Sequence, residues 1–502
     1  MKQLPLPLNS NDLNTNRKDL VRTTFSHEDV CPQNARRQLE RQYMMLLEET
    51  DEFNRQLVSY QGNKGEMVHS WIKYREGFSA ELVQSLINKF GIQPGQTLLE
   101  PFSGSATTLL VAIANGINAV GIEILPVCHL AWEAKSHAFE YDTDELERIL
   151  ELIEETEPGP ARHRFPHLAI TDSAFPDTTE NDLMFYTEWF DLLDVSVEAK
   201  VLLRLVLTSI LEEVSFTRKD GQYLRWDSRS DKVRQRNRER AWQGKRLIKG
   251  MDKGDLPTVK DALIRALSTI VDDVKELQLA SRTKGQATLF KGSALQILPT
   301  LESNQFAGVI TSPPYCNRYD YTRTYALELA YLKVDEEEIR ELRQSQLSCT
   351  VEHRSKVEQL RDYYASIDAS DRFERTLDIV LSNPVFQEVN EALRIRWERG
   401  EINNRGILSM VEGYFIELAF VFAEVLRTCQ PGAHVAFVND NVRYGGEVIP
   451  VDLLTTHLAE QLGYEPQIVY VLPNRKGNSS QQMKRFGREA LRKSITIWKK
   501  PD

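Results

Sequence analysis

One short stretch, residues 97–123, constrains the fold of this chain more than any other. Residues 97–100 are apolar and end in an acid, residues 101–106 contain a glycine, and residues 107–115 have the composition of a buried helix. Residues 118–123 are a second apolar run that also ends in an acid. A strand, a glycine turn, a helix and a second strand form a βαβ unit, which builds a parallel sheet through a right-handed crossover. We therefore predict an α/β fold with a doubly wound, Rossmann-like sheet.

The same alternation of strands and helices returns later in the chain, after two long interruptions of helical and charged character. Near the N-terminus, amphipathic spacing predicts one helix over about 33–58 and a second over 79–90. The predicted units are an N-terminal arm and helix (1–66), the cofactor-binding half of a core (67–135), a helical and basic insertion (136–284), core with a catalytic loop (285–333), a helical insertion (334–404), and C-terminal core strands with a basic loop (405–502).

Composition excludes several classes of protein. With 41% hydrophobic and 27% charged residues, the chain is neither disordered nor fibrous. The five cysteines are scattered and form no C-x-x-C pair, so neither a disulfide framework nor a metal site is predicted. The N-terminus lacks a signal-peptide core and no run of about 18 apolar residues occurs, so we expect a soluble, cytoplasmic protein with no membrane partner. The net charge of −11 argues against coating of nucleic acid through overall charge, but it permits a local basic face.

The turn after the first strand is a candidate cofactor site. Gly104 lets the backbone approach a ligand closely, and the start of the next helix offers free N–H groups. Glu123 ends the following strand, twenty-three residues after Glu100, where a carboxylate can accept hydrogen bonds from both hydroxyls of a ribose. The pattern predicts an adenosine-containing cofactor, with a plain turn between strand and helix as the alternative.

A second candidate site is Thr311-Ser-Pro-Pro-Tyr315, which directly follows another predicted strand. The prolines lack N–H groups, so carbonyl oxygens of this loop are rigidly presented as free acceptors. The Ser312 hydroxyl and a prolyl carbonyl can hold the two N–H bonds of an exocyclic amino group and turn its lone pair toward a methyl donor. Tyr315 offers a flat face on which an extruded base can stack. The alternative is a structural turn with a packing tyrosine.

Together the two motifs resemble those of one enzyme family. EPFSGSATT (100–108) is similar to the D-P-F-x-G-x-G-T-T loop, and TSPPY (311–315) to the (D/N/S)-P-P-(Y/F) loop, of the S-adenosylmethionine-dependent DNA amino-methyltransferases that make N4-methylcytosine or N6-methyladenine. The Ser-Pro-Pro-Tyr form is more usual in the cytosine-N4 branch. Residues 69–79 occupy the place of the segment that closes over the methionine part of the cofactor, and residues 290–294 resemble the turn that contacts its adenine.

The resemblance implies a seven-stranded methyltransferase sheet with long helical insertions, S-adenosylmethionine as cofactor and double-stranded DNA as substrate. It implies a role in restriction–modification or phage defence, with a restriction endonuclease or another defence subunit as a partner. The residues implied for transfer are Ser312, Pro313, Pro314 and Tyr315. Those implied for the cofactor are Phe78, Ser79, Glu100, Pro101, Phe102, Gly104, Ser105, Thr107, Thr108, Glu123 and Ser293.

Three of these positions depart from the family pattern. Glu100 stands for the usual Asp, Ala106 for the second Gly, and Ser293 for the Asp of the third turn. We expect Glu100 to keep its hydrogen bonds through a longer reach, and Ala106 to be tolerated at a negative φ. Ser293 supplies no charge to the adenine contact.

Other functions compete with cytosine-N4 methylation. Adenine-N6 methylation, methylation of RNA or protein, and a non-catalytic specificity subunit on the same fold stay open. C5-cytosine methylation needs a Pro-Cys nucleophile, which Cys31, Cys128 and Cys316 do not provide. A nuclease-like PD…ExK spacing occurs within residues 176–200, but its second half lies in a helical pattern, which argues against a nuclease.

Two basic tracts are candidates for DNA binding. Residues 218–253 hold thirteen Lys and Arg against five Asp and Glu, and residues 475–500 hold nine against one, so each carries +8. Arginines and amides on such tracts suit phosphate and base-edge contacts, whereas a solvated helix face is the alternative. The candidate DNA-binding residues are Arg225, Arg234, Arg238, Arg475, Lys476, Asn478 and Arg485.

Overall fold

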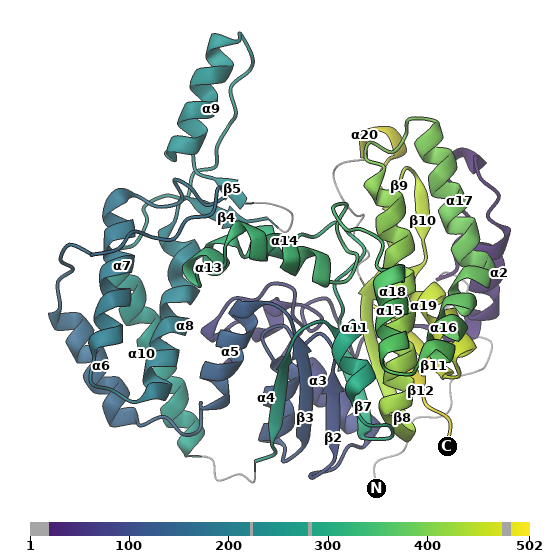
Figure 1. Cartoon of the computed structure of the whole chain (residues 1–502), viewed down its shortest axis with the longest axis horizontal. Coiled ribbons are helices and arrows are strands. Elements are labelled where there is room, and N and C mark those ends of the chain that lie inside the picture. The colour runs from purple at the N-terminus through teal and green to yellow at the C-terminus, as the bar shows by residue number, and fades with distance from the viewer. Residues whose placement is uncertain (1–19, 221–223, 280–283, 474–482) are drawn as a thin grey trace, which may run out of the picture.

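The computed structural model describes residues 20–220, 224–279, 284–473 and 483–502 (Figure 1). Its centre is an eight-stranded sheet in the order β1-β11-β12-β8-β7-β2-β3-β6. Neighbouring strands run parallel, except that β12 is antiparallel to both β11 and β8. The strands are β1 (Leu47–Glu49), β2 (Thr97–Glu100), β3 (Asn118–Glu123), β6 (Ala287–Lys291), β7 (Phe306–Thr311), β8 (Cys429–Asp440), β11 (Glu465–Val471) and β12 (Lys493–Lys499).

The predicted Rossmann-like α/β class is confirmed, with one strand more than the seven expected. The extra strand is β1, whose Leu47 to Glu49 pair with Val469 to Val471 at the sheet edge. The single helix predicted over 33–58 is therefore wrong. Helix α2 (Asn34–Gln42) covers only the first part of this range. A 3₁₀ turn (Met44–Leu46) then leads directly into β1. An available sheet edge decides the conformation here, because tertiary pairing overrides a local helical pattern.

Helices cover both faces of the sheet. On one face, α3 (Ala80–Phe90) and α4 (Thr107–Ala114) pack over Leu98, Ile310 and Val438. The α3 boundaries follow the predicted signals, because the Ser79 hydroxyl accepts the Leu82 N–H at 3.1 Å. On the other face, α18 (Gly406–Thr428) and α19 (Val451–Leu462) pack over the opposite side chains of the same strands.

The first insertion forms a helical unit beside the sheet, and its buried side chains share one apolar cluster with residues 68–74 and 321–349. Figure 1 shows α6, α7, α8 and α10 side by side at the left, and α9 projecting away from them beyond the short β4–β5 hairpin. The bounds are α5 (Pro126–Ser136), α6 (Thr143–Glu155), α7 (Asp177–Leu192), α8 (Val197–Val214), β4 (Thr217–Lys219), β5 (Leu224–Trp226), α9 (Asp231–Trp242) and α10 (Val259–Gln278). The nuclease-like Glu198 and Lys200 lie in α8, as the helical pattern predicts.

The second insertion covers α18. It comprises α14 (Glu336–Ser345), α15 (Val357–Ser366), α16 (Ser370–Ser382) and α17 (Pro384–Glu398), and the short helices α12 (Tyr321–Thr324) and α13 (Ala326–Tyr331) lead into it. Within the described part of the chain, α18 is the one helix long and apolar enough to span a membrane. It lies in the protein core, where its Glu417 and Glu424 form ion pairs with Lys356 and Arg372. Its apolar composition is thus that of a core helix.

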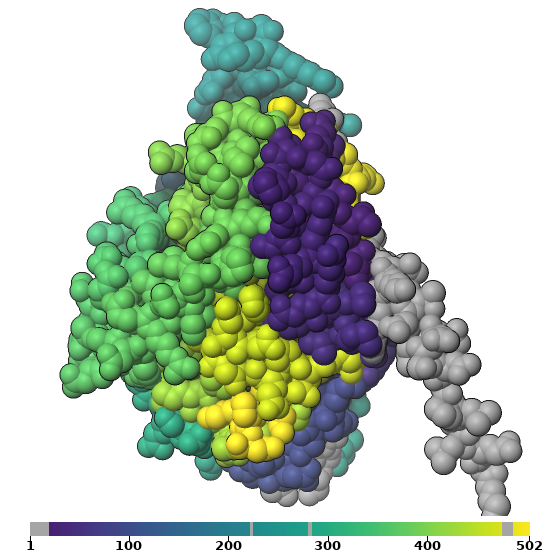
Figure 2. Space-filling model, turned by 90° about the vertical axis from the view of Figure 1, so that its right-hand side faces the viewer, coloured from purple at the N-terminus to yellow at the C-terminus, as the bar shows by residue number. Residues whose placement is uncertain are grey.

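The N-terminal segment joins the second insertion to the C-terminal strands. In Figure 2 the purple segment lies against both the green insertion and the yellow C-terminal region. Arg36 on α2 is fully buried and pairs with Glu388 on α17 at 2.7 Å and with Glu447 on β10 (Glu447–Ile449) at 3.1 Å. β10 pairs with β9 (Val442–Tyr444), and the short α20 (Met483–Phe486) follows later.

Candidate active site

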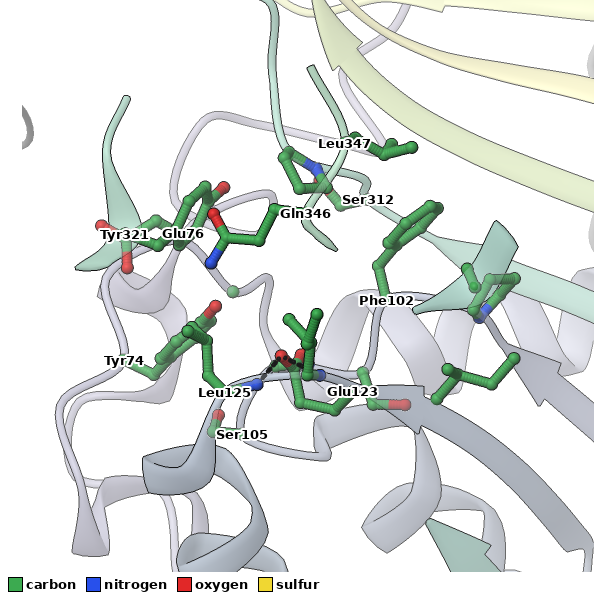
Figure 3. A pocket seen from close by; sticks show the side chains of 18 of the residues that line it. Tyr74, Glu76, Phe102, Ser105, Glu123, Leu125, Ser312, Tyr321, Gln346 and Leu347 are labelled. Carbon is green, nitrogen blue, oxygen red and sulfur yellow. Dashed lines mark hydrogen bonds between the residues drawn. The ribbon is translucent and has the colours of Figure 1, made fainter. Parts of the chain in front are cut away.

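A cavity lies where β2, β3 and β7 end, and both motifs found in the sequence contribute to its wall (Figure 3). About 770 Å³ of space lies between its walls and in the open solvent at its mouth. The predicted residues that line it are Phe78, Pro101, Phe102, Gly104, Ser105, Thr107, Glu123, Ser293, Ser312 and Pro314. Those that do not are Ser79, Glu100, Thr108, Pro313 and Tyr315.

Glu123 lies on the floor of this cavity and is held by backbone donors. One carboxylate oxygen accepts the N–H groups of Ile124 at 2.8 Å and Leu125 at 2.9 Å, and the other accepts that of Gly104 at 2.7 Å. Burial raises the pKa of Glu123, while these three N–H groups oppose the shift. The carboxylate keeps lone pairs toward the cavity, so it can accept further hydrogen bonds from a ligand.

Glu100 lies beneath the cavity and joins three segments. It is 1% exposed and accepts hydrogen bonds from the hydroxyls of Thr108 at 2.9 Å and Thr311 at 2.6 Å, and from the Phe102 N–H at 3.2 Å. Burial raises its pKa to about 8. The hydrogen-bonding capacity predicted for Glu100 is thus used to tie β2 to α4 and β7.

The glycine loop has two residues in the left-handed region. Gly104 has φ +51°, and a Cβ there would lie 2.7 Å from the Tyr74 ring. Ala106 has φ +65°, so our expectation of a negative φ at this position is wrong. Its backbone must turn to begin α4, and it adopts a conformation that costs an L-residue about 1–2 kcal/mol.

Ser79 and Ser293 begin helices at the edge of the site. Ser79 is fully buried and caps α3, while its neighbour Phe78 faces the cavity. Ser293 lies at the N-terminus of α11 (Ala294–Ile297) and lines the cavity itself.

The loop after β7 places Ser312 at the cavity and Tyr315 beside it. The Ser312 hydroxyl lies 3.1 Å from the Tyr315 hydroxyl and 3.3 Å from the Val438 carbonyl oxygen. Lys493 Nζ lies 3.1 Å from the Tyr315 hydroxyl, 4.7 Å from the ring centroid and 3.2 Å from Asp440. Burial opposes the charge of Lys493, but Tyr315 and Asp440 raise its pKa. Lys493 therefore donates a hydrogen bond to the Tyr315 hydroxyl and makes a cation–π contact with its ring. The sequence analysis did not predict this contact.

The family of this chain follows from its similarity to known proteins. A family model described as DNA methylase, of the N6/N4 type, matches residues 14–131. The type II methyltransferase M.BsoBI of Geobacillus stearothermophilus is 57% identical over 95% of this chain and 94% of its own length. The type II methyltransferase M.AvaI of Nostoc sp. is 37% identical over 92% of each chain.

The chain is a type II DNA methyltransferase of the N6/N4 family. It acts on DNA within a restriction–modification system, and S-adenosylmethionine is its methyl donor. The cavity of the methyltransferase fits this cofactor, because a carboxylate, a glycine whose Cβ would collide with the wall, and apolar side chains such as Phe102 all face it. When bound, the cofactor supplies an electrophilic methyl group on a sulfonium sulfur.

Several residues at the cavity of the methyltransferase carry no signal in the two motifs. Glu76 accepts hydrogen bonds from the hydroxyls of Tyr319 and Tyr325, and burial raises its pKa to about 7. Tyr74 stacks on Tyr325 with ring centroids 5.2 Å apart. Both belong to the 69–79 segment, so a search of that segment for polar and aromatic residues could have found them. Further missed residues are Ile124, Leu125, Tyr321, Gln346 and Leu347.

The predicted DNA-binding residues lie apart from one another. Arg234 and Arg238 are exposed on α9, the projecting helix (Figure 1). Arg225 on β5 pairs with Asp220 at 2.7 Å, and Arg485 on α20 with Glu401 at 2.9 Å. Arg475, Lys476 and Asn478 lie outside the described residues.

Proposed function

We propose that this methyltransferase transfers a methyl group to N4 of a cytosine that is extruded from double-stranded DNA. The observation that supports this is that Glu123 and Ser312 line the same cavity. One site therefore holds a carboxylate for the ribose hydroxyls of the cofactor and a hydroxyl for an N–H of the target amino group. The Ser-Pro-Pro-Tyr form of the loop favours cytosine over adenine as the target base.

The loop residues act by position. The Ser312 hydroxyl donates its proton to Tyr315 or to the Val438 carbonyl, so its lone pairs are free to accept one N–H of the target amino group. A carbonyl of the prolyl pair accepts the other N–H. The nitrogen lone pair then points at the methyl group, and transfer is in line. The nitrogen loses a proton to solvent as the new C–N bond forms.

The ribose of the cofactor belongs at Glu123, and its methionine part beside Phe78 and Gly104. Glu123 is held in one orientation by three N–H groups, which prepares its remaining lone pairs for the ribose hydroxyls. Ser293 offers a hydroxyl to the adenine ring in place of the usual carboxylate.

The basic helix α9 would bind the DNA backbone. In Figure 1, α14 lies above the sheet, and α9 and α20 lie higher still. The last residue of α14, Ser345, lines the cavity. Arg234 and Arg238 project from α9, where phosphate contacts would release counterions. Arg485 on α20 would contact DNA as well. Arg475, Lys476 and Asn478 stay candidates from the sequence alone. Such a methyltransferase protects DNA from a restriction endonuclease that cuts the same site.

The test is modification-sensitive sequencing of DNA from cells that express the protein. We expect N4-methylcytosine at one sequence motif and no modification with Ser312→Ala, whose fold and cofactor binding should be kept. N6-methyladenine at the motif would replace the cytosine assignment. Modification that persists at the wild-type level with Ser312→Ala would remove the loop from catalysis.

A further inference from the structure

The second insertion, whose function the sequence leaves open, delivers a buried polar side chain into the active site. Gln346 directly follows α14 and lines the same cavity as Ser312. Its side chain is 6% exposed, and its Oε1 has no hydrogen-bond partner among the residues that the structure describes. A buried amide oxygen without a donor is unfavourable, so the free protein keeps this group ready for a ligand that brings one.

The backbone on both sides of Gln346 is held by a buried ion pair. Its carbonyl oxygen accepts a hydrogen bond from Lys356 Nζ at 2.8 Å. Lys356 pairs at 2.9 Å with Glu417 of α18, and Glu417 accepts the Ser348 N–H at 2.8 Å. This buried ion pair therefore holds the chain on both sides of Gln346. A rigid backbone that presents a free amide is the arrangement expected of a binding residue.

The insertion is also tied to the segment that follows the catalytic loop. Arg343 on α14 lies 3.2 Å from Asp320 and donates a hydrogen bond to the Thr322 hydroxyl at 2.9 Å. Asp320 caps α12 only eight residues after Ser312. The ion pair thus sets the position of Gln346 relative to Ser312.

The direction of the Gln346 amide indicates that its ligand is the target base and not the cofactor. Figure 3 shows the Gln346 side chain extending into the cavity toward Glu76 and Tyr321, with Ser312 on the same wall and Glu123 and Leu125 across the cavity. The proposed ribose contact is at Glu123. The wall that carries Gln346 therefore faces the group that receives the methyl.

We propose that Gln346 binds the edge of the extruded target base. This inference rests on the proposed function, because it needs a base at Ser312. Oε1 accepts the N–H that points along the ring edge, and Nε2 donates to the ring nitrogen beside the amino group. Cytosine and adenine both carry an amino group next to a ring acceptor, so the same amide fits either base. Ser312 Oγ shares the N–H along the ring edge with Oε1, and the carbonyl of the prolyl pair takes the other N–H.

The experiment compares Gln346→Met, which keeps the length of the side chain and removes both polar groups, with Gln359→Ala as a control. Gln359 is exposed on α15 of the same insertion. Calorimetry measures S-adenosylhomocysteine binding without DNA, and steady-state methylation is measured on a duplex with the mapped site. We expect Gln346→Met to lower kcat/KM for DNA roughly 10- to 100-fold, as loss of a buried hydrogen-bonding pair does. Binding of S-adenosylhomocysteine should stay within about 2-fold, and Gln359→Ala should match the wild type.

A duplex that is abasic at the target position separates base contact from DNA contact. Gln346→Met should bind this duplex as tightly as the wild type does. Weaker binding of the abasic duplex, or of S-adenosylhomocysteine, would overturn the assignment and make Gln346 a structural or cofactor contact. Unchanged methylation by Gln346→Met would overturn it as well. Methylation by the wild type and its loss in Ser312→Ala test the proposed function separately, so a failure confined to Gln346→Met concerns this inference alone.

Discussion

Replacing Gly104 by alanine tests whether the glycine loop is built around the cavity wall. The residue has φ +51°, which costs an L-residue about 1–2 kcal/mol. The new Cβ would lie 2.7 Å from Cε1 and 3.2 Å from Cδ1 of Tyr74. That ring is 7% exposed and stacked on Tyr325, so it cannot move without displacing a second aromatic ring. Overpacking of this kind costs typically about 1–3 kcal/mol. Gly104→Ala should therefore lower the free energy of unfolding by about 2–5 kcal/mol.

Gly91→Ala is the matched control, because Gly91 has φ +65° and nothing lies within 4 Å of the Cβ position. It should lose only the backbone contribution of about 1–2 kcal/mol. Urea denaturation gives both free energies, and calorimetry gives the affinity for S-adenosylhomocysteine. We expect Gly104→Ala to lose at least about 1 kcal/mol more than the control and to bind the ligand at least roughly tenfold more weakly. Equal losses in the two variants, or full ligand affinity in Gly104→Ala, would refute the reasoning.

Three further changes test the rest of the site. Lys493→Met removes the cation from the hydroxyl and ring of Tyr315, so kcat should fall about tenfold while S-adenosylhomocysteine affinity is kept; a loss of affinity with kcat intact would contradict a positioning role. The pKa of Glu100 is about 8 in the folded protein against 4.5 for the ordinary carboxyl, so its contribution to stability is full below pH 4.5 and is lost as the pH rises toward 8. Urea denaturation of Glu100→Gln should accordingly show a smaller loss of stability between about pH 5 and 8.5 than the wild type, and an identical pH profile would show that Glu100 does not titrate there. Replacing Arg234 and Arg238 on α9 by alanine should weaken DNA binding and reduce the magnitude of the slope of log K against log salt by about 1.8. An unchanged slope in a salt titration would show that α9 is a solvated helix without phosphate contacts.

The parts of the site that the sequence predicts are those with a local cause. Gly104 is needed because the chain turns with a positive φ beside Tyr74, and the acids at 100 and 123 mark the ends of two neighbouring strands. The start and end of α3 are equally local, since Ser79 and Gly91 supply its caps. Each of these features depends on a few consecutive residues, so a pattern can predict it.

The parts that the sequence does not predict depend on distant partners. Glu76 becomes a buried carboxyl at the cavity only because Tyr319 and Tyr325 approach it from a segment more than 240 residues away. Gln346 looks like any amide in a charged helical tract until Lys356 and Glu417 fix its backbone. Motif spacing contains no record of such contacts.

The formal charge of a segment does not show how many of its cations are free to bind DNA. The two basic tracts hold the same formal charge, but the structure uses them differently. In the C-terminal tract, Arg492 is 2% exposed between Glu40 and Asp452, and Lys493 is committed to Tyr315 and Asp440. These cations are held by carboxylates and by the Tyr315 hydroxyl, so they are not available to phosphates. On α9 only Val233 is buried, and Arg234, Arg236 and Arg238 are exposed to solvent. The DNA contacts made by described residues should therefore come mainly from the projecting helix, and a salt titration should respond more strongly to changes on α9 than to changes at Arg485.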